Sequence, residues 1–100
     1  MVLHGYFRSS AAWRVRIALN LKGLTAEHRA HHLRRGEHRD AGYTRLNPQG
    51  LVPALEVDGG GAVLTQSLAI CEYLDETHPE PPLLPRKPVP RAKARAFAQA

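Results

Sequence analysis

The spacing of apolar and polar residues over the first 25 positions predicts a strand followed by a helix. Residues 2–7 (VLHGYF) form a short run rich in strand-forming side chains. Polar Arg8, Ser9 and Ser10 then interrupt this run with residues of the kind that begin helices. Over residues 11–22 the apolar side chains return at helical spacing, at Val15, Ile17, Ala18, Leu19 and Leu21. Gly23 follows at the position where glycine commonly ends a helix.

Further elements follow from the same kind of pattern, punctuated by turn chemistry. Asn47-Pro48-Gln49-Gly50 is a strong turn sequence, and Asp58-Gly59-Gly60-Gly61 is suited to a hairpin. Between and around these turns the pattern predicts, in order, a polar strand over 26–32, a short helix over 37–45, a strand over 52–57, a returning strand over 62–64 and a helix over 66–77.

The order of these elements predicts an α/β fold of thioredoxin-like topology, βαβαββα, with one mixed sheet and helices on both faces. Residues 1–78 would form this domain. Residues 79–90 belong to a stretch rich in proline, which is typical of a stiff extended linker. Residues 91–100 have strong helix formers, and we interpret them as the first helix of an all-helical C-terminal domain.

Composition narrows the classes of function. The chain has a formal net charge of +5, but its basic residues are scattered and accompany no nucleic-acid-binding motif, so we expect a solvated basic surface that attracts small anions. Its single cysteine, Cys71, excludes an internal disulfide and a CxxC redox pair, and we expect it to be a buried small hydrophobe. The six histidines follow no zinc spacing, so no metal site is predicted. No membrane-spanning run or export signal is evident, which predicts a cytoplasmic protein.

Three ordered motifs resemble conserved blocks of the zeta class of glutathione transferases. Ser9-Ser10-Ala11-Ala12-Trp13-Arg14-Val15-Arg16-Ile17-Ala18-Leu19 is similar to the class motif SSCSWRVRIAL. The stretches 47–55 (NPQGLVPAL) and 64–70 (LTQSLAI) resemble its second and third blocks. Together the motifs extend the resemblance over essentially the whole chain.

Each motif also has a physical interpretation. Ser9 and Ser10 stand where a strand gives way to a helix, and free amides with the helix dipole favour anions at such a point. A thiolate held there would have a lowered pKa, although an ordinary serine N-cap would have the same sequence. Gln66 and Ser67 open a helix in the same way, either as a carboxylate site or as a plain cap.

The resemblance implies glutathione as the cofactor and assigns it a set of residues. Ser9 would lie nearest the glutathione sulfur. Pro53 would follow a cis peptide bond, exposing the backbone of Val52 to pair with the cysteinyl part of glutathione, whereas the alternative is a trans proline at an edge strand. Gln66 and Ser67 would bind the γ-glutamyl carboxylate. His38 and, more weakly, Gln49 are candidates for the glycyl end, although a loop histidine is often merely solvated.

The resemblance also implies a reaction, the cis–trans isomerisation of maleylacetoacetate to fumarylacetoacetate in aromatic amino acid catabolism. Ser9, Ser10 and Arg8 would be catalytic residues, with the Arg8 guanidinium pairing with a carboxylate of a small unsaturated acid. Ala11 replaces the cysteine of the class motif, so any mechanism that needs a thiol there fails. We also expect a homodimer at full length and little or no isomerase activity from residues 1–100 alone.

Alternatives remain open at this point. The same scaffold could isomerise maleylpyruvate, or conjugate glutathione to electrophiles such as α-halo acids. A different class is a non-catalytic module for protein assembly, which intact sulfur-site motifs argue against. A glutaredoxin-like role is poorly supported because the turn before the first helix contains no cysteine.

Overall fold

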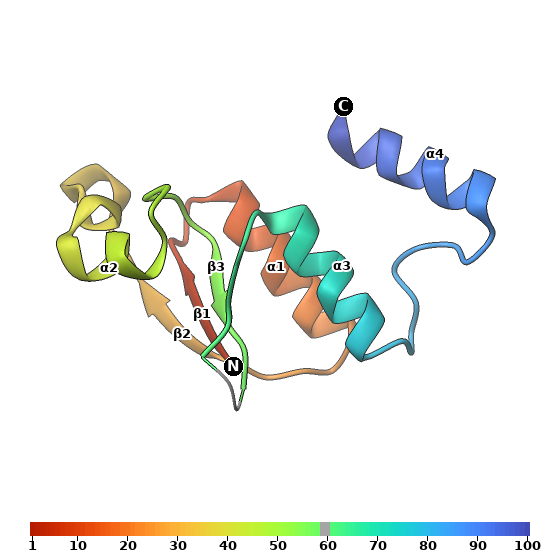
Figure 1. Cartoon of the computed structure of the whole chain (residues 1–100), viewed down its shortest axis with the longest axis horizontal. Helices are drawn as coiled ribbons and strands as arrows, with labels where there is room; N and C mark the ends of the chain where they lie inside the picture. Colours follow the sequence, from red (N-terminus) through yellow and green to blue (C-terminus); the bar gives the residue numbers. More distant parts are fainter. Residues whose placement is uncertain (59–60) are drawn as a thin grey trace.

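A computed structural model describes residues 1–58 and 61–100, and it has one four-stranded mixed sheet in the order β2-β1-β3-β4 (Figure 1). In chain order the elements are β1 Val2–Gly5, α1 Ser10–Leu21, β2 Glu27–Ala30, two 3-10 turns at Leu33–Arg35 and Glu37–Arg39, α2 Ala41–Leu46, β3 Ala54–Glu56, β4 Val63–Thr65, α3 Ser67–Thr77 and α4 Pro88–Gln99. β1 runs parallel to β2, and β3 runs antiparallel to both β1 and β4. The predicted thioredoxin-like α/β topology is therefore confirmed.

The two faces of β1 carry different chemistry because side chains alternate along a strand. Leu3 points into the main core, where it joins Leu55 of β3 and apolar side chains of α1 and α3, namely Val15, Ala18, Leu19, Ile70 and Leu74. His4 points to the opposite face, where Tyr43 of α2 contacts it. Helices thus cover both faces, as predicted, with α1 and α3 on one and the short α2 on the other (Figure 1).

Helices α1 and α3 lie side by side and run in the same direction (Figure 1). Two polar contacts join them at the same sequence offset of 53 residues. Near the helix starts, the Arg14 guanidinium donates to the Ser67 hydroxyl at 2.6 Å. Near the end of α1, the Lys22 ammonium donates to the Asp75 carboxylate at 2.7 Å. The side chains of Lys22 and Asp75 are buried, so this ion pair lies inside the fold.

The buried pair also holds the segment that follows α3. Lys22 donates to the Pro81 carbonyl, and the Leu83 amide donates to the Asp75 carboxylate at 2.7 Å. Burial opposes ionisation of Asp75, but the hydrogen bonds from Lys22 and Leu83 outweigh it and lower the pKa of this carboxyl. The proline-rich stretch is therefore tied to the domain and is not a free spacer.

Several predicted boundaries were wrong, mostly because strands were predicted too long. The first strand ends at Gly5 rather than residue 7, since the Tyr6 carbonyl turns away to accept from the Ser9 amide. The second strand covers 27–30 of the predicted 26–32, and the third covers 54–56 of the predicted 52–57. The predicted helix over 37–45 is a 3-10 turn followed by α2 at 41–46. The fourth strand is 63–65, not 62–64, and the tip of the predicted hairpin at 59–60 lies outside the described residues.

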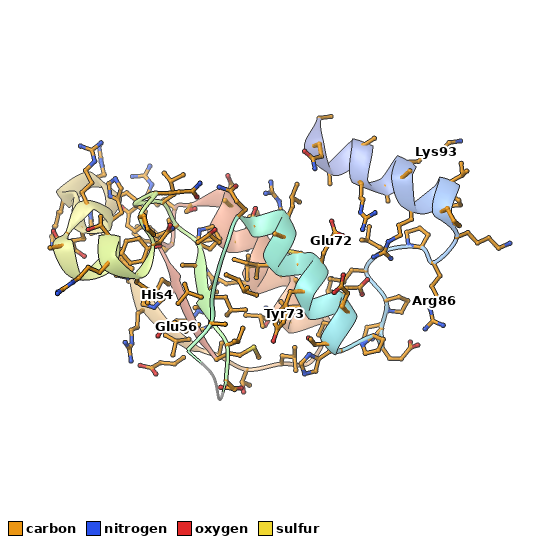
Figure 2. The ribbon with its side chains drawn as sticks, in the orientation of Figure 1. His4, Glu56, Glu72, Tyr73, Arg86 and Lys93 are labelled. Carbon is orange, nitrogen blue, oxygen red and sulfur yellow. The ribbon has the colours of Figure 1, made fainter. Side chains whose placement is uncertain are left out.

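The last helix begins at Pro88, three residues before its predicted start, because proline is well suited to the first turn of a helix. Figure 2 shows Glu72 projecting from α3 toward α4, where Arg95 donates to it at 2.6 Å and Arg91 lies 4.0 Å away. The final helix is therefore linked to α3 by these ion pairs. No helix in the described part of the chain is long and apolar enough to cross a membrane.

We predict that Lys22→Met lowers the free energy of unfolding by about 3–5 kcal/mol, because it leaves the buried Asp75 carboxylate without its partner. Chemical denaturation at pH 7 would measure this loss. The matched double variant Lys22→Met/Asp75→Leu should recover much of it. A double variant no more stable than Lys22→Met alone would contradict the assignment.

Candidate functional site

Three chain segments meet at one edge of the sheet, which is the edge formed by the ends of β1, β3 and β4 and not by an outer strand. β3 runs antiparallel to β1 and β4, and Ala54, its first residue, pairs with His4 on one side and Thr65 on the other. The turn that follows β1, the loop that precedes β3 and the start of α3 after β4 therefore emerge at the same edge (Figure 1). These segments hold Ser9, Val52-Pro53 and Gln66-Ser67, so the fold brings the three predicted motifs together.

Ser9 is the N-cap of α1. Its backbone is extended, and its hydroxyl oxygen accepts a hydrogen bond from the Ala12 amide at 3.1 Å. Because the oxygen acts as an acceptor in the cap, the hydroxyl hydrogen is left to donate to a group outside the helix. The first-turn amides have no acceptor within the helix, and the helix dipole adds partial positive charge. Ser9 is half-buried and Ser10 is exposed, so both a cap and a donor to an anion are compatible with this geometry.

A cavity of about 480 Å³ opens beside Ser9. Aromatic, serine and arginine side chains line it: Phe7, Arg8, Ser9, Ser10, Trp13 and Arg16. Among the described residues no carboxylate lines this cavity, so its two guanidinium groups favour an anionic guest.

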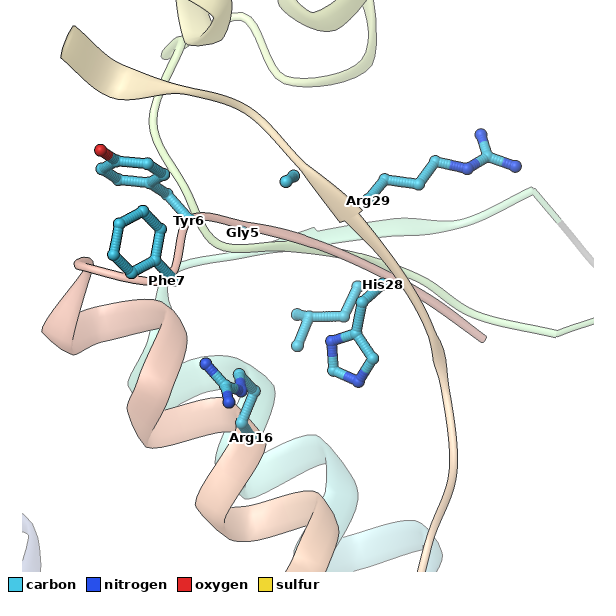
Figure 3. Close-up of a pocket in the computed structure, with 8 residues that line it drawn as sticks. Gly5, Tyr6, Phe7, Arg16, His28 and Arg29 are labelled. Carbon is cyan, nitrogen blue, oxygen red and sulfur yellow. The ribbon is translucent and has the colours of Figure 1, made fainter.

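A second cavity of about 280 Å³ adjoins the first, sharing Phe7 and Arg16 with it. It lies between α1 and the outer strand β2, and Figure 3 shows Arg16 of α1 and His28 of β2 on either side of it. Arg29 also lines it but forms an ion pair with Glu27 at 3.1 Å. Arg16 lines both cavities, so its guanidinium adds positive charge to each of them.

The peptide bond between Val52 and Pro53 is cis, which confirms the prediction for Pro53. Two hydrogen bonds hold the preceding loop: the Asn47 side-chain amide donates to the Leu51 carbonyl at 2.8 Å, and the Tyr43 hydroxyl donates to the same carbonyl. Pro53 is buried and Val52 is half-buried, just outside the start of β3. This placement leaves the Val52 backbone at the edge where an extended peptide could pair with it.

The residue before helix α3 has an unusual backbone conformation. Gln66 has φ of 69°, in a region that residues other than glycine rarely adopt. Its side chain does not cap the helix but donates to the Gln49 side-chain oxygen at 3.0 Å, linking the start of α3 to the loop before β3. Ser67 is 7% exposed, and its hydroxyl oxygen accepts from Arg14. The first amides of α3 are thus left for an anion rather than for its own side chains.

His38 lies in the 3-10 turn at Glu37–Arg39, not in an open loop. Its carbonyl oxygen would lie 3.3 Å from a Cβ atom added at Gly50, so this turn packs directly against the loop before β3. The buried Nδ1 atom of His38 has no hydrogen-bond partner in the described part of the structure. An orphaned buried nitrogen is what a missing ligand would leave, although His32 has a similar one.

A histidine cluster lies next to this region, on the face of the sheet that α2 covers. The buried His4 ring contacts the Glu56 carboxylate at 2.6 Å (Figure 2). It also contacts the His31 ring at 2.8 Å. His31 lies against Tyr43, with ring centroids 4.2 Å apart, and Tyr43 holds the Leu51 carbonyl. Burial, and then the neighbouring His4, lower the pKa of His31, while Glu37 and Asp40 oppose this shift and His38 adds to it.

Some features of the site could not be read from the sequence. The Arg14–Ser67 contact joins residues far apart in the chain, and only the α1–α3 pairing reveals it. Arg16 reaches the cavity because helix side chains lean back toward the helix start, and Phe7 lines it from the turn between β1 and α1. Cys71, which we expected to be a buried small hydrophobe, is half-buried in α3, and burial raises the pKa of its thiol, which disfavours the nucleophilic thiolate.

Comparison with known proteins places these features among characterised relatives. The family model "Glutathione S-transferase, N-terminal domain" matches residues 8–77. The chain is 54% identical to a probable maleylacetoacetate isomerase of Vibrio cholerae, over 98% of this chain and 46% of the relative.

Two solved structures are similarly close. A maleylacetoacetate isomerase from Methylobacterium extorquens AM1, with bound malonate and GSH, superposes with a TM-score of 0.94 at 49% identity, over 99% of this chain and 46% of that one. The holo structure of a bacterial zeta-class maleyl pyruvate isomerase gives a TM-score of 0.90 at 49% identity, over 98% and 45% respectively. The chain therefore spans about half the length of these relatives.

We predict that the stability of this domain falls as the pH drops below 6.5, the ordinary pKa of His31. The folded state lowers the pKa of His31, so the unfolded chain takes up more protons there and gains stability as the pH falls. Unfolding free energies at pH 7.5 and 5.5 would show this, and His31→Gln should reduce the difference. The control His28→Gln, at an exposed histidine of β2, should keep it. An unchanged difference in His31→Gln would contradict the prediction.

Proposed function

This chain belongs to the glutathione S-transferase family, as an N-terminal domain of the zeta-class, maleylacetoacetate isomerase type, and we propose that it forms the glutathione-binding half of a glutathione-dependent isomerase. The observation that carries this proposal is the convergence of Ser9, Val52-Pro53 and Gln66-Ser67 at one sheet edge. The reaction proposed is the conversion of maleylacetoacetate to fumarylacetoacetate.

The residues present fit glutathione by their chemistry. A tripeptide with a thiol and two carboxylates needs a donor for its sulfur, a backbone to pair with, and positive sites for its ends. The Ser9 hydroxyl, the Val52 backbone and the open start of α3 match the first, second and third of these needs. His38, whose Nδ1 atom has no partner among the described residues, and the Gln49 side chain are candidates for the glycyl end.

Glutathione held by these residues would supply a thiolate, the nucleophile for reversible addition to the conjugated cis double bond of the acid. Ser9 stabilises the negative charge on sulfur by donating its hydroxyl hydrogen, and the first turn of α1, including Ser10, adds positive potential. Gln66 and Ser67 hold the γ-glutamyl carboxylate, while Val52 and Pro53 fix the cysteinyl backbone. Ala11 supplies no thiol, so no side chain at that position competes with the cofactor.

Arg8 is the proposed substrate-binding residue of this half. It is exposed and lines the same cavity as Ser9 and Ser10, so a carboxylate paired with it would lie next to the sulfur site. The related structure with malonate and GSH shows that one relative binds a small dicarboxylate together with glutathione. A small unsaturated acid is therefore the proposed substrate class, with maleylpyruvate as the second candidate because of the 49% identical maleyl pyruvate isomerase.

Other parts of the proposal concern the whole protein. We propose a cytoplasmic homodimer in which residues 1–78 are the glutathione domain, 79–87 are the linker, which is shorter than predicted because α4 begins at Pro88, and α4 is the start of an all-helical domain. The exposed Phe97 of α4 is consistent with further helices packing there. Isomerase activity is proposed for the protein at its natural length.

We predict that Ser9→Ala lowers kcat about a hundredfold, by analogy with the loss of one preorganised donor to a developing anion. Steady-state turnover of maleylacetoacetate and maleylpyruvate by the protein at its natural length would test both candidate substrates. Ser9→Thr keeps a hydroxyl and a capping oxygen and should retain most activity. Wild-type turnover in Ser9→Ala would contradict the role of Ser9. Failure of the unmodified protein to bind glutathione would favour the non-catalytic module instead.

A separate prediction concerns Arg8. Arg8→Ala should raise KM for the acid substrate about tenfold, the size of one lost charge-assisted hydrogen bond, and leave KM for glutathione unchanged. Arg45→Ala, at an exposed arginine of α2, is the matched control and should change neither value. Equal changes of both KM values in Arg8→Ala would show that Arg8 does not act on the acid.

A further inference from the structure

In the described part of the structure Arg14 forms a short hydrogen bond that the proposed mechanism does not use. Its Nη1 atom donates to the Ser67 hydroxyl oxygen at 2.6 Å, from the second turn of α1 to the first residue of α3. The separate Lys22–Asp75 pair joins the same two helices near their other end. The contact therefore fixes the start of α3 relative to the start of α1.

We propose that Arg14 is a positioning residue that turns the Ser67 hydroxyl into a hydrogen-bond donor toward the γ-glutamyl carboxylate of glutathione. This inference rests on the proposed function, in which the start of α3 receives that carboxylate. It adds Arg14 to the residues that affect glutathione binding, and Arg14 does so through Ser67 rather than by contacting the ligand.

The direction of the hydrogen bond carries the argument. A guanidinium group has only donors, so Ser67 Oγ must accept from Arg14. A serine hydroxyl has one hydrogen, and this hydrogen must then point away from Arg14 toward another acceptor. Ser67 is 7% exposed, so water has little access to that hydrogen. A carboxylate at the open start of α3 would be the matching acceptor.

Charge supports the same assignment. In the described part of the structure no carboxylate forms an ion pair with Arg14; the nearby Glu72 instead pairs with Arg95 and Arg91. The positive charge of Arg14 is therefore not cancelled by an acidic partner there. It adds to the partial positive charge of the α3 dipole at the point where a carboxylate would bind.

The test is calorimetric binding of two ligands to the protein at its natural length. One ligand is glutathione, and the other is an analogue in which a 4-aminobutanoyl group replaces the γ-glutamyl group and so removes its carboxylate. Arg14→Met should weaken glutathione binding about tenfold, as expected for one charge-assisted hydrogen bond, and leave the Kd of the analogue unchanged. Ser67→Ala should behave in the same way, and the double variant should bind no more weakly than Ser67→Ala.

Two further variants control for charge and folding. Arg86→Met removes one positive charge at an exposed arginine after α3 and should bind both ligands like the unmodified protein. Arg14→Lys keeps the charge and a donor, and should lose less glutathione affinity than Arg14→Met. It also allows the comparison if Arg14→Met does not fold.

The outcomes separate this inference from the proposed function. If the unmodified protein does not bind glutathione, the proposed function fails and this inference fails with it. If the unmodified protein binds glutathione, and both Arg14→Met and Arg14→Lys bind it as tightly as the unmodified protein does, only the role of Arg14 is overturned. Equal weakening of both ligands, or additive effects of the Arg14 and Ser67 changes, would assign Arg14 a merely structural role.

Discussion

The site depends on the parallel pairing of α1 and α3. Arg14–Ser67 and Lys22–Asp75 join the helices at one constant offset, so residues eight positions apart on α1 meet residues eight positions apart on α3. Apolar residues fill the space between these two polar contacts. Because the helices are parallel and in register, both begin at the same sheet edge, and the positive ends of both dipoles face that edge. An antiparallel pair would separate those ends by the length of a helix.

Residues on the other face of the sheet hold the loop before β3, which has little regular structure. His4, Glu56 and His31 form a hydrogen-bonded cluster beneath Tyr43, and Tyr43 and Asn47 both donate to the Leu51 carbonyl. This polar network leaves Val52 and Pro53 positioned beside β1 and β4. The alternation of Leu3 and His4 on β1 therefore serves both halves of the site, the helix pair on one face and the loop on the other.

Much of this arrangement was predictable because it follows from local chemistry. Hydrophobic spacing located α1 and α3, the motifs located Ser9, Pro53 and Ser67, and the antiparallel order of β3 required them to meet. Strand ends were less predictable, because Tyr6 and Phe7 have strand propensity but are drawn into the turn that caps α1. The contacts of Arg14, His31 and Lys22 were not predictable, since each depends on a partner more than 25 residues away.

The origin of the nucleophilic sulfur follows from where the single thiol of this chain lies. Its one cysteine, Cys71, lies in α3, and burial raises the pKa of its thiol, which disfavours the thiolate. At the start of α1, where helix amides and the Ser9 hydroxyl would favour a thiolate, the chain has Ala11 instead. The environment suited to a thiolate and the thiol of the chain are thus in different places. Within the proposed function, the nucleophilic sulfur must therefore arrive with the bound peptide, and the protein supplies the site that ionises it.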